Sequence, residues 1–137
     1  MIEAPKEIME SNSKNFTRAK ETLPEGITTI EYTDFEKIEL RVGEIENVED
    51  IEGADKLYKL TVSLGEEVRT ICAGIKNYYS HEDLKGLKIV VLANLKPRKL
   101  RGIMSEGMLL AAANKDESKV VLIGPTTQDI EVGSRVM

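Results

Sequence analysis

The sequence predicts an all-β fold, a five-stranded OB-type Greek-key barrel with extra C-terminal strands and a short N-terminal helical extension. Three observations lead to this class. Short stretches in which apolar and polar residues alternate recur from residue 38 onward. One helical turn falls between the third and the fourth stretch, and the pattern offers none of the long crossover helices that a parallel sheet requires. The alternation of the first stretch shifts at Gly43, which is typical of a strand bent around a barrel.

Composition sets the size and the compartment. The chain of 137 residues is 41% hydrophobic, which is enough for one domain with a modest appendage. Its single cysteine, Cys72, leaves no disulfide within the chain and favours a reducing compartment. No apolar run has the length of a membrane span, and the first residues lack the order of a signal peptide. We therefore expect a cytoplasmic protein without a membrane partner.

Residues 1–33 form an N-terminal extension that differs from the rest of the chain. Pro5 and the stretch Pro24-Glu25-Gly26 interrupt it, and few apolar residues recur at helical spacing. We expect either a short helix near residues 5–21, followed by a turn and an extended approach to the main domain, or partial disorder. The barrel domain is expected over residues 34–137.

The first three strands are expected from their alternation. Ile38, Leu40 and Val42 are separated by polar residues, so the first strand begins here, and Gly43 is the predicted position of a bulge. The second strand has four apolar residues at alternate positions: Tyr58, Leu60, Val62 and Leu64. The "LGEEV" sequence that follows suits a hairpin turn into a third strand near residues 68–73.

The "SHEDLKGLK" sequence predicts one helical turn. Ser80 is a suitable N-cap, and Asp83 is its reciprocal partner in a capping box. Gly86 is placed where the turn should end.

The last segments supply the remaining strands. Residues 88–95 predict a buried strand, and residues 102–113 predict a fifth strand that Gly107 interrupts. Two further strand-like pieces, 120–123 and 130–136, are separated by a Gly-Pro turn. Because extra strands on a closed barrel need cover, we expect a partner subunit.

Catalysis is poorly supported by the sequence. The only histidine, His81, falls in the capping turn and is expected to be a solvated surface residue. Cys72 is expected to be a small buried apolar residue, and no signal brings it to His81. Metal-ligand spacings and Gly-rich phosphate loops do not occur. We therefore expect no catalytic residues, no metal and no cofactor.

The sequence "NLKPRKLR", residues 94–101, concentrates positive charge on a chain with a formal net charge of -5. Lys96, Arg98, Lys99 and Arg101 occur there without an intervening acid. We expect this segment to be the extended loop between the fourth and fifth strands, which borders the oligonucleotide-binding face of an OB-fold. Arginine grips phosphate with two hydrogen bonds, and lysine adds a mobile charge. A solubilising loop is the alternative, but the position favours the binding of a polyanion.

Four polar or charged residues are expected to extend this site. Asn94 and Ser105 flank the loop with groups that suit base edges or ribose hydroxyls, although both residues are also common in turns. Arg41 on the first strand and Lys76 in the "GIKNYY" loop would enlarge the cationic surface.

Apolar and aromatic residues near the loop are candidates for contact with bases. Met108 is either part of the core or an exposed apolar platform beneath a base. Tyr78 and Tyr79 offer rings for base stacking, and one of the two is expected to pack against the barrel instead.

These motifs resemble the tRNA-binding domain family. The resemblance rests on "DFEKIELRVGEI", "GADKLYKLTVSLGEEVRTICAGI" and "YYSHEDLKGLKIVVLANLKPRKLRGIMSEGMLLAA", and it covers about residues 34–137. The family is an OB-fold that occurs as an appended domain of methionyl-tRNA synthetases, as free-standing tRNA-binding proteins, in eukaryotic synthetase cofactors and in the export-related chaperone CsaA. The family's groove motif is matched here at Asn94, Lys96, Pro97, Ser105, Gly107 and Met108.

The resemblance implies structure-dependent binding of tRNA without catalysis. It implies that the chain aids tRNA capture as the C-terminal domain or beta subunit of methionyl-tRNA synthetase, with the catalytic subunit as a partner. It also implies a homodimer joined through the C-terminal region. The alternative is a CsaA-like chaperone that binds extended peptides through an apolar patch around Met104 and Met108. The N-terminal extension is longer than CsaA usually carries, which favours the synthetase relationship.

Overall fold

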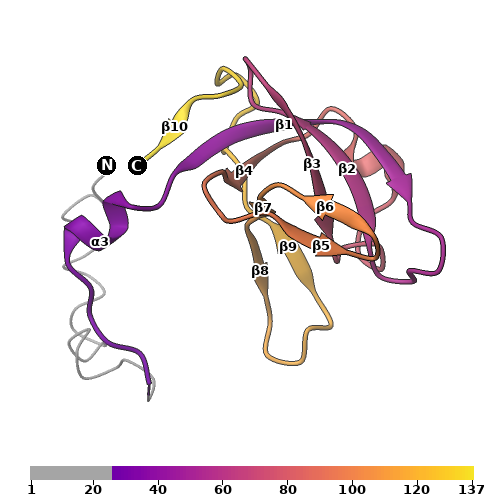
Figure 1. The fold of residues 1–137 in the computed structure, drawn as a ribbon, viewed down its shortest axis with the longest axis horizontal. Helices are drawn as coiled ribbons and strands as arrows, with labels where there is room; N and C mark the ends of the chain where they lie inside the picture. The colour runs from indigo at the N-terminus through magenta and orange to yellow at the C-terminus, as the bar shows by residue number, and fades with distance from the viewer. Residues whose placement is uncertain (1–25) are drawn as a thin grey trace. The chain divides into compact units, whose positions relative to one another are not determined.

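The computed structural model describes residues 26–137 (Figure 1). The chain divides into two compact units, of which the first ends at Lys37 and the second spans Ile38–Val136. The helix expected near residues 5–21 lies outside the described residues.

The described part of the first unit contains one short helix, α3 (Tyr32–Glu36). It begins after Glu31, whose backbone N–H donates to the carboxylate of Asp34 at 3.1 Å. The rings of Tyr32 and Phe35 lie one turn apart with centroids separated by 6.2 Å. The extended approach expected here was therefore wrong over these residues, because local capping stabilises a helical turn instead.

The second unit is the predicted antiparallel barrel. Its main sheet has the strand order β3-β2-β1-β4-β7, and β10 pairs with the beginning of β1. The barrel closes beyond β3, where the backbone N–H of Glu106 donates to the carbonyl of Thr70 at 2.8 Å. The strands are β1 (Leu40–Asp50), β2 (Tyr58–Ser63), β3 (Val68–Ala73), β4 (Lys88–Leu92), β7 (Met108–Leu109) and β10 (Arg135–Val136).

The long strand β1 curves across the barrel and pairs with both β2 and β4 (Figure 1). Its register against β2 shifts between Ile45 and Asn47, so the bulge lies there and not at Gly43. Gly43 instead points into the core. A Cβ added to it would lie 2.8 Å from Val62 Cγ1 and 2.9 Å from Val91 Cγ2. The glycine is therefore required for close packing, and Ile38, expected inside the strand, lies before it and is exposed.

The alternation in β2 and the capping turn were both predicted correctly. Tyr58, Leu60 and Val62 are buried, and they belong to a core that also contains residues of β1, β3 and β4. Helix α4 (His81–Leu84) begins at Ser80 with the predicted capping box to Asp83. Within residues 26–137, no helix has the length and apolar character needed to cross a membrane.

The segment after β4 differs from the expected single fifth strand. Residues 98–113 form four short strands: β5 (Arg98–Leu100), β6 (Ile103–Ser105), β7 and β8 (Ala111–Ala113). Gly107 has a φ of +139° and separates β6 from β7. Its position is crowded, since an added Cβ would lie 3.0 Å from the carbonyl oxygen of Leu92.

The C-terminal strands find partners within the chain. Strand β9 (Val120–Leu122) pairs with β8 in a separate hairpin that projects from the barrel, and β10 pairs with β1 (Figure 1). The strand expected over residues 130–136 is reduced to β10. A partner subunit is therefore not needed for strand pairing, although Val121 and Ile123 on the β8–β9 hairpin remain exposed.

Candidate nucleic-acid interface

The cationic segment is a two-stranded hairpin and not the extended loop that we expected. Strand β5 pairs with β6 in the register Arg98 opposite Ser105, Lys99 opposite Met104 and Leu100 opposite Ile103. Arg101 and Gly102 form the turn, with φ values of +49° and +81°. We call residues 96–105 the cation hairpin.

The inner face of the cation hairpin is attached to the barrel by a small apolar cluster. Leu100 and Ile103 pack against buried Ile51, Ala54 and Cys72. Ile51 and Ala54 belong to the β1–β2 loop, so the hairpin lies over the loop that forms the other border of an OB-fold binding face. Apolar burial thus fixes the hairpin while its cations remain in solvent.

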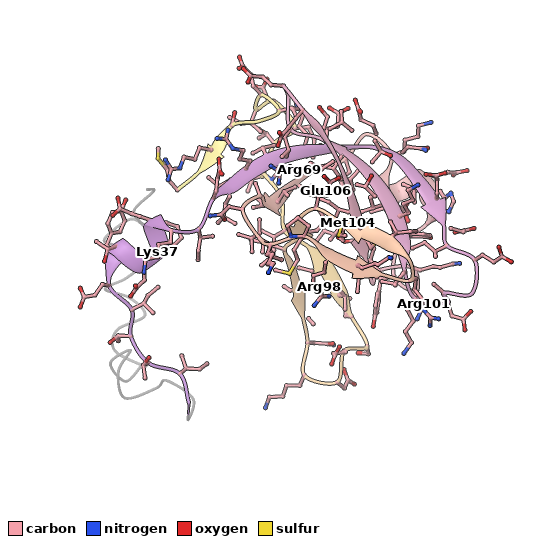
Figure 2. All side chains as sticks on the ribbon, in the orientation of Figure 1. Lys37, Arg69, Arg98, Arg101, Met104 and Glu106 are labelled. Carbon is pink, nitrogen blue, oxygen red and sulfur yellow. The ribbon has the colours of Figure 1, made fainter. Side chains whose placement is uncertain are left out.

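The outer surface of the cation hairpin presents charge together with one apolar side chain. All four cations are exposed, and Met104, opposite Lys99, is 51% exposed. Figure 2 shows Arg98 and Arg101 at opposite ends of the hairpin. None of Lys96, Arg98, Lys99 and Arg101 forms an ion pair with any of residues 26–137. Their charges are therefore available to an anionic ligand.

Arg41 and Lys76, by contrast, are already paired. Arg41 forms an ion pair with Glu39 at 2.5 Å and donates to the carbonyl of Gly133 at 3.0 Å. Lys76 lies 3.6 Å from Asp50, a carboxylate that it shares with His81. The structure does not bring either cation into the cation hairpin, and neutralisation by an acid weakens the attraction of each for phosphate.

A polar depression of about 530 Å³ surrounds Arg41 and is rich in carboxylates. Glu39, Glu66, Glu67 and Glu131 line it beside Arg41 and Arg69. More acids than bases face this space, so it is a poor site for a polyanion.

The two flanking polar residues hold the ends of the cation hairpin. Asn94 accepts a hydrogen bond from the backbone N–H of Glu39 at 2.9 Å, which joins the end of β4 to the beginning of β1. Ser105 is only 5% exposed, and its hydroxyl accepts from the backbone N–H of Cys72 at 3.0 Å. The hydrogen bonds of Asn94 and Ser105 are those of residues that position the cation hairpin.

Met108 and Tyr78 are exposed at the surface, whereas Tyr79 packs against the core. Met108 is 44% exposed, which agrees with a platform and not with a core residue. Tyr79 packs on the core and its hydroxyl accepts from the backbone N–H of Leu122, as expected for one member of the pair. Tyr78 is partly exposed and shares with Met108 a groove of about 430 Å³.

Arg69 is a contributor that sequence reasoning missed. Its guanidinium donates to the carbonyls of Ala93 and Glu106, which precede and follow the cation hairpin, and it pairs with Glu67 at 2.6 Å. Figure 2 shows Arg69 beside Glu106. No local pattern could reveal this role, because Ala93 and Glu106 are far from Arg69 in the sequence and meet it only in the folded barrel.

The residues considered for catalysis lie in ordinary environments. Cys72 is buried, as predicted, and burial raises the pKa of its thiol, so the reactive thiolate is disfavoured. His81 is half exposed on the surface, as predicted, and its Nε2 lies 3.0 Å from Asp50 Oδ1.

A small antiparallel barrel that carries a cationic hairpin at its rim is the architecture of a nucleic-acid-binding module. Residues 40–135 match the family described as putative tRNA binding domain, and the chain belongs to this family. The resemblance read from the sequence is thereby confirmed.

Three known proteins illustrate the relationship. The chain is 47% identical over 135 residues to the methionine–tRNA ligase of Caldanaerobacter subterraneus subsp. tengcongensis, a match that covers 98% of this chain and 21% of that protein. The chain therefore spans about a fifth of this relative. It also resembles the crystal structure of a MetRS related protein from Pyrococcus horikoshii, with a TM-score of 0.76, 38% identity and coverage of 81% and 100%. The chaperone CsaA of Bacillus anthracis has a TM-score of 0.72, 26% identity and coverage of 80% and 100%.

Proposed function

We propose that this chain is a non-catalytic module that binds tRNA by its shape and aids tRNA capture by methionyl-tRNA synthetase. The observation that carries the proposal is the cation hairpin, whose four exposed cations have no ion-pair partner among the described residues. Lysine and arginine neutralise phosphates and release counterions, so affinity should fall as salt rises. Membership of the tRNA-binding family supports RNA as the polyanion.

The proposed partner is the catalytic part of a methionyl-tRNA synthetase, either as a separate subunit or within the same polypeptide. The similarity to methionine–tRNA ligases supports this assignment. Such a role belongs in the cytoplasm, where tRNA is charged. Arg41 and Lys76, each paired with an acid, would add little to the site, whereas Asn94 and Ser105 would position the hairpin.

We also propose that the chain forms a homodimer through the β8–β9 hairpin. Val121 and Ile123 are 48% and 40% exposed, and Ala112, which lies opposite Val121 in the hairpin, is exposed as well. A second copy would cover this apolar surface. Sedimentation of the purified chain tests the proposal, and a monomer at all concentrations would contradict it.

A chaperone is the second candidate function. The CsaA structures resemble this fold, and the exposed Met104 and Met108 provide adaptable apolar surface of the kind that suits extended peptides. The two functions differ in salt dependence, because apolar contacts are not weakened by salt.

Binding of tRNA to the full chain at several salt concentrations tests the main proposal, with double-stranded DNA and an unfolded peptide as competitors. The double variant Arg98→Ala, Lys99→Ala should bind tRNA more weakly, with a salt slope shallower by about one to two units. The double variant Lys85→Ala, Arg135→Ala removes one lysine and one arginine from exposed positions outside the cation hairpin and should bind as the wild type does. Equal slopes for the two variants would refute the assignment of the hairpin. If the chain binds the unfolded peptide but not tRNA, the chaperone function would be favoured.

A further inference from the structure

The groove that contains Tyr78 and Met108 begins where the cation hairpin is attached. Cys72 lines this groove, and the same residue lies in the apolar cluster beneath Leu100 and Ile103. Its backbone N–H also donates to Ser105, which lies directly opposite Arg98 in the hairpin. An RNA chain whose phosphates contact the hairpin would therefore have this groove within reach of its neighbouring nucleotides.

Tyr78 presents a ring that is held in place. Its hydroxyl donates to the backbone carbonyl of Glu117 at 2.7 Å, in the loop between β8 and β9. The side chain is nevertheless 36% exposed and lines the groove. A ring that is fixed before binding loses little entropy when a ligand stacks on it.

The other walls of the groove suit a flat ligand. Met108 offers a polarizable apolar side chain, and the small residues Ala73, Gly74 and Ala111 leave the space open. The volume of about 430 Å³ falls in the range of small-molecule sites and is ample for one nucleobase.

The polar lining matches a base better than it matches a phosphate or an apolar peptide side chain. Asn77 supplies an amide that both donates and accepts hydrogen bonds, as base edges do. Glu117 also lines the groove, and its negative charge repels a phosphate from the interior. Lys56, in the β1–β2 loop, can attract the phosphate that is attached to a nucleotide whose base lies in the groove.

We propose that this groove binds one unstacked nucleobase of the RNA whose phosphates contact the cation hairpin, with Tyr78 as the stacking surface and Asn77 at the base edge. The inference rests on the proposed tRNA binding and adds a second kind of contact to it. Stacking contributes affinity that does not depend on salt, so the two contacts can be separated by experiment.

The test compares two short single-stranded RNAs with the full-length chain. One carries 2-aminopurine at a central position, and the other has an abasic site at that position. The wild type should bind the abasic RNA about tenfold more weakly, and 2-aminopurine fluorescence should be quenched on binding. Tyr78→Ala should remove both effects and leave the salt slope unchanged. Tyr78→Phe, which keeps the ring, should retain most of the preference, and thermal melting verifies that each variant folds.

Three results would overturn the proposal. Equal affinity of the wild type for the two RNAs would exclude a base in the groove. Equal behaviour of Tyr78→Ala and Tyr78→Phe would exclude stacking on Tyr78. Displacement of the 2-aminopurine RNA by an unfolded peptide whose own affinity falls in Tyr78→Ala would assign the groove to peptides. A parallel titration with unmodified tRNA separates the two failures. Loss of tRNA binding would refute the proposed function, whereas intact tRNA binding with no binding of either short RNA would exclude the groove as a site for a single unstacked base.

Discussion

The hydroxyl of Ser105 accepts a hydrogen bond from the backbone N–H of Cys72 at 3.0 Å and donates to the carbonyl of Gly107 at 3.3 Å. The first bond joins the end of β6 to β3, and the second joins it to the residue that precedes β7. Apolar burial of Leu100 and Ile103 attaches the cation hairpin to the barrel, and the hydrogen bonds of Ser105 at its base help to set its orientation. The position of four cations is therefore determined partly by one buried serine.

Replacement of Ser105 by alanine should destabilise the protein. The backbone N–H of Cys72 would lose its partner in a buried region, which costs about 1–3 kcal/mol of the free energy of unfolding. Denaturant titration measures this change. Ser63→Ala is the matched control, because its hydroxyl accepts from Gly65 at an exposed site where water replaces the bond, and its cost should stay below about 0.5 kcal/mol. Equal losses in the two variants would contradict the role assigned to Ser105.

Gly43→Ala should also destabilise the barrel. The new methyl group would lie 2.8 Å from Val62 Cγ1 and 2.9 Å from Val91 Cγ2, so the core must shift at a cost of about 1–3 kcal/mol. Gly74→Ala adds the same atom at a site where the nearest side-chain atom is 3.9 Å away, and it should be tolerated. Comparison of the two unfolding midpoints tests the prediction, which fails if Gly43→Ala is as stable as Gly74→Ala.

Local sequence signals predicted the regular parts of this fold. Alternation located β2, and the capping box of Ser80 and Asp83 located α4, because each signal depends on residues that are neighbours in the chain. The bulge of β1 was misplaced, since a glycine that signals flexibility and a glycine that makes room for Val62 look alike in a sequence.

The candidate site was predictable in its charges but not in its geometry. The run of cations at residues 96–101 marked this segment as the candidate surface, and all four cations are exposed in the structure. The hairpin itself could not be foreseen, because Pro97 and the charged residues around it lack strand alternation, and Arg101 replaces the glycine or asparagine usual at a turn with positive φ. The bonds from Arg69 to Ala93 and Glu106 depend on contacts between distant segments, which a local pattern does not contain.

The carboxylate of Asp50 should stabilise the protein in a pH-dependent manner. Its hydrogen bond with His81, aided by the charge of Lys76, lowers its pKa from the ordinary value of 3.8. The folded chain thus keeps Asp50 ionised to lower pH than the unfolded chain, so the stabilisation is present above pH 3.8 and is lost as the pH falls through the lowered pKa. The stability difference between the wild type and Asp50→Asn should shrink on acidification. In a His81→Ala background the difference should be smaller above pH 3.8, and an unchanged difference there would show that His81 is not the cause.

Arg101 should trade stability for RNA binding. Its φ of +49° is unfavourable for an arginine, and it precedes Gly102 in a two-residue turn for which Asn-Gly is preferred. Arg101→Asn should therefore raise the free energy of unfolding by roughly 1 kcal/mol while it makes the salt slope of tRNA binding shallower by about one unit. Arg98→Asn removes the same charge from strand β5, where no backbone strain is relieved, and should weaken binding without a gain in stability. A loss of stability in Arg101→Asn would show that the backbone of Arg101 is not strained. An unchanged salt slope would show that the charge of Arg101 does not contribute to tRNA binding.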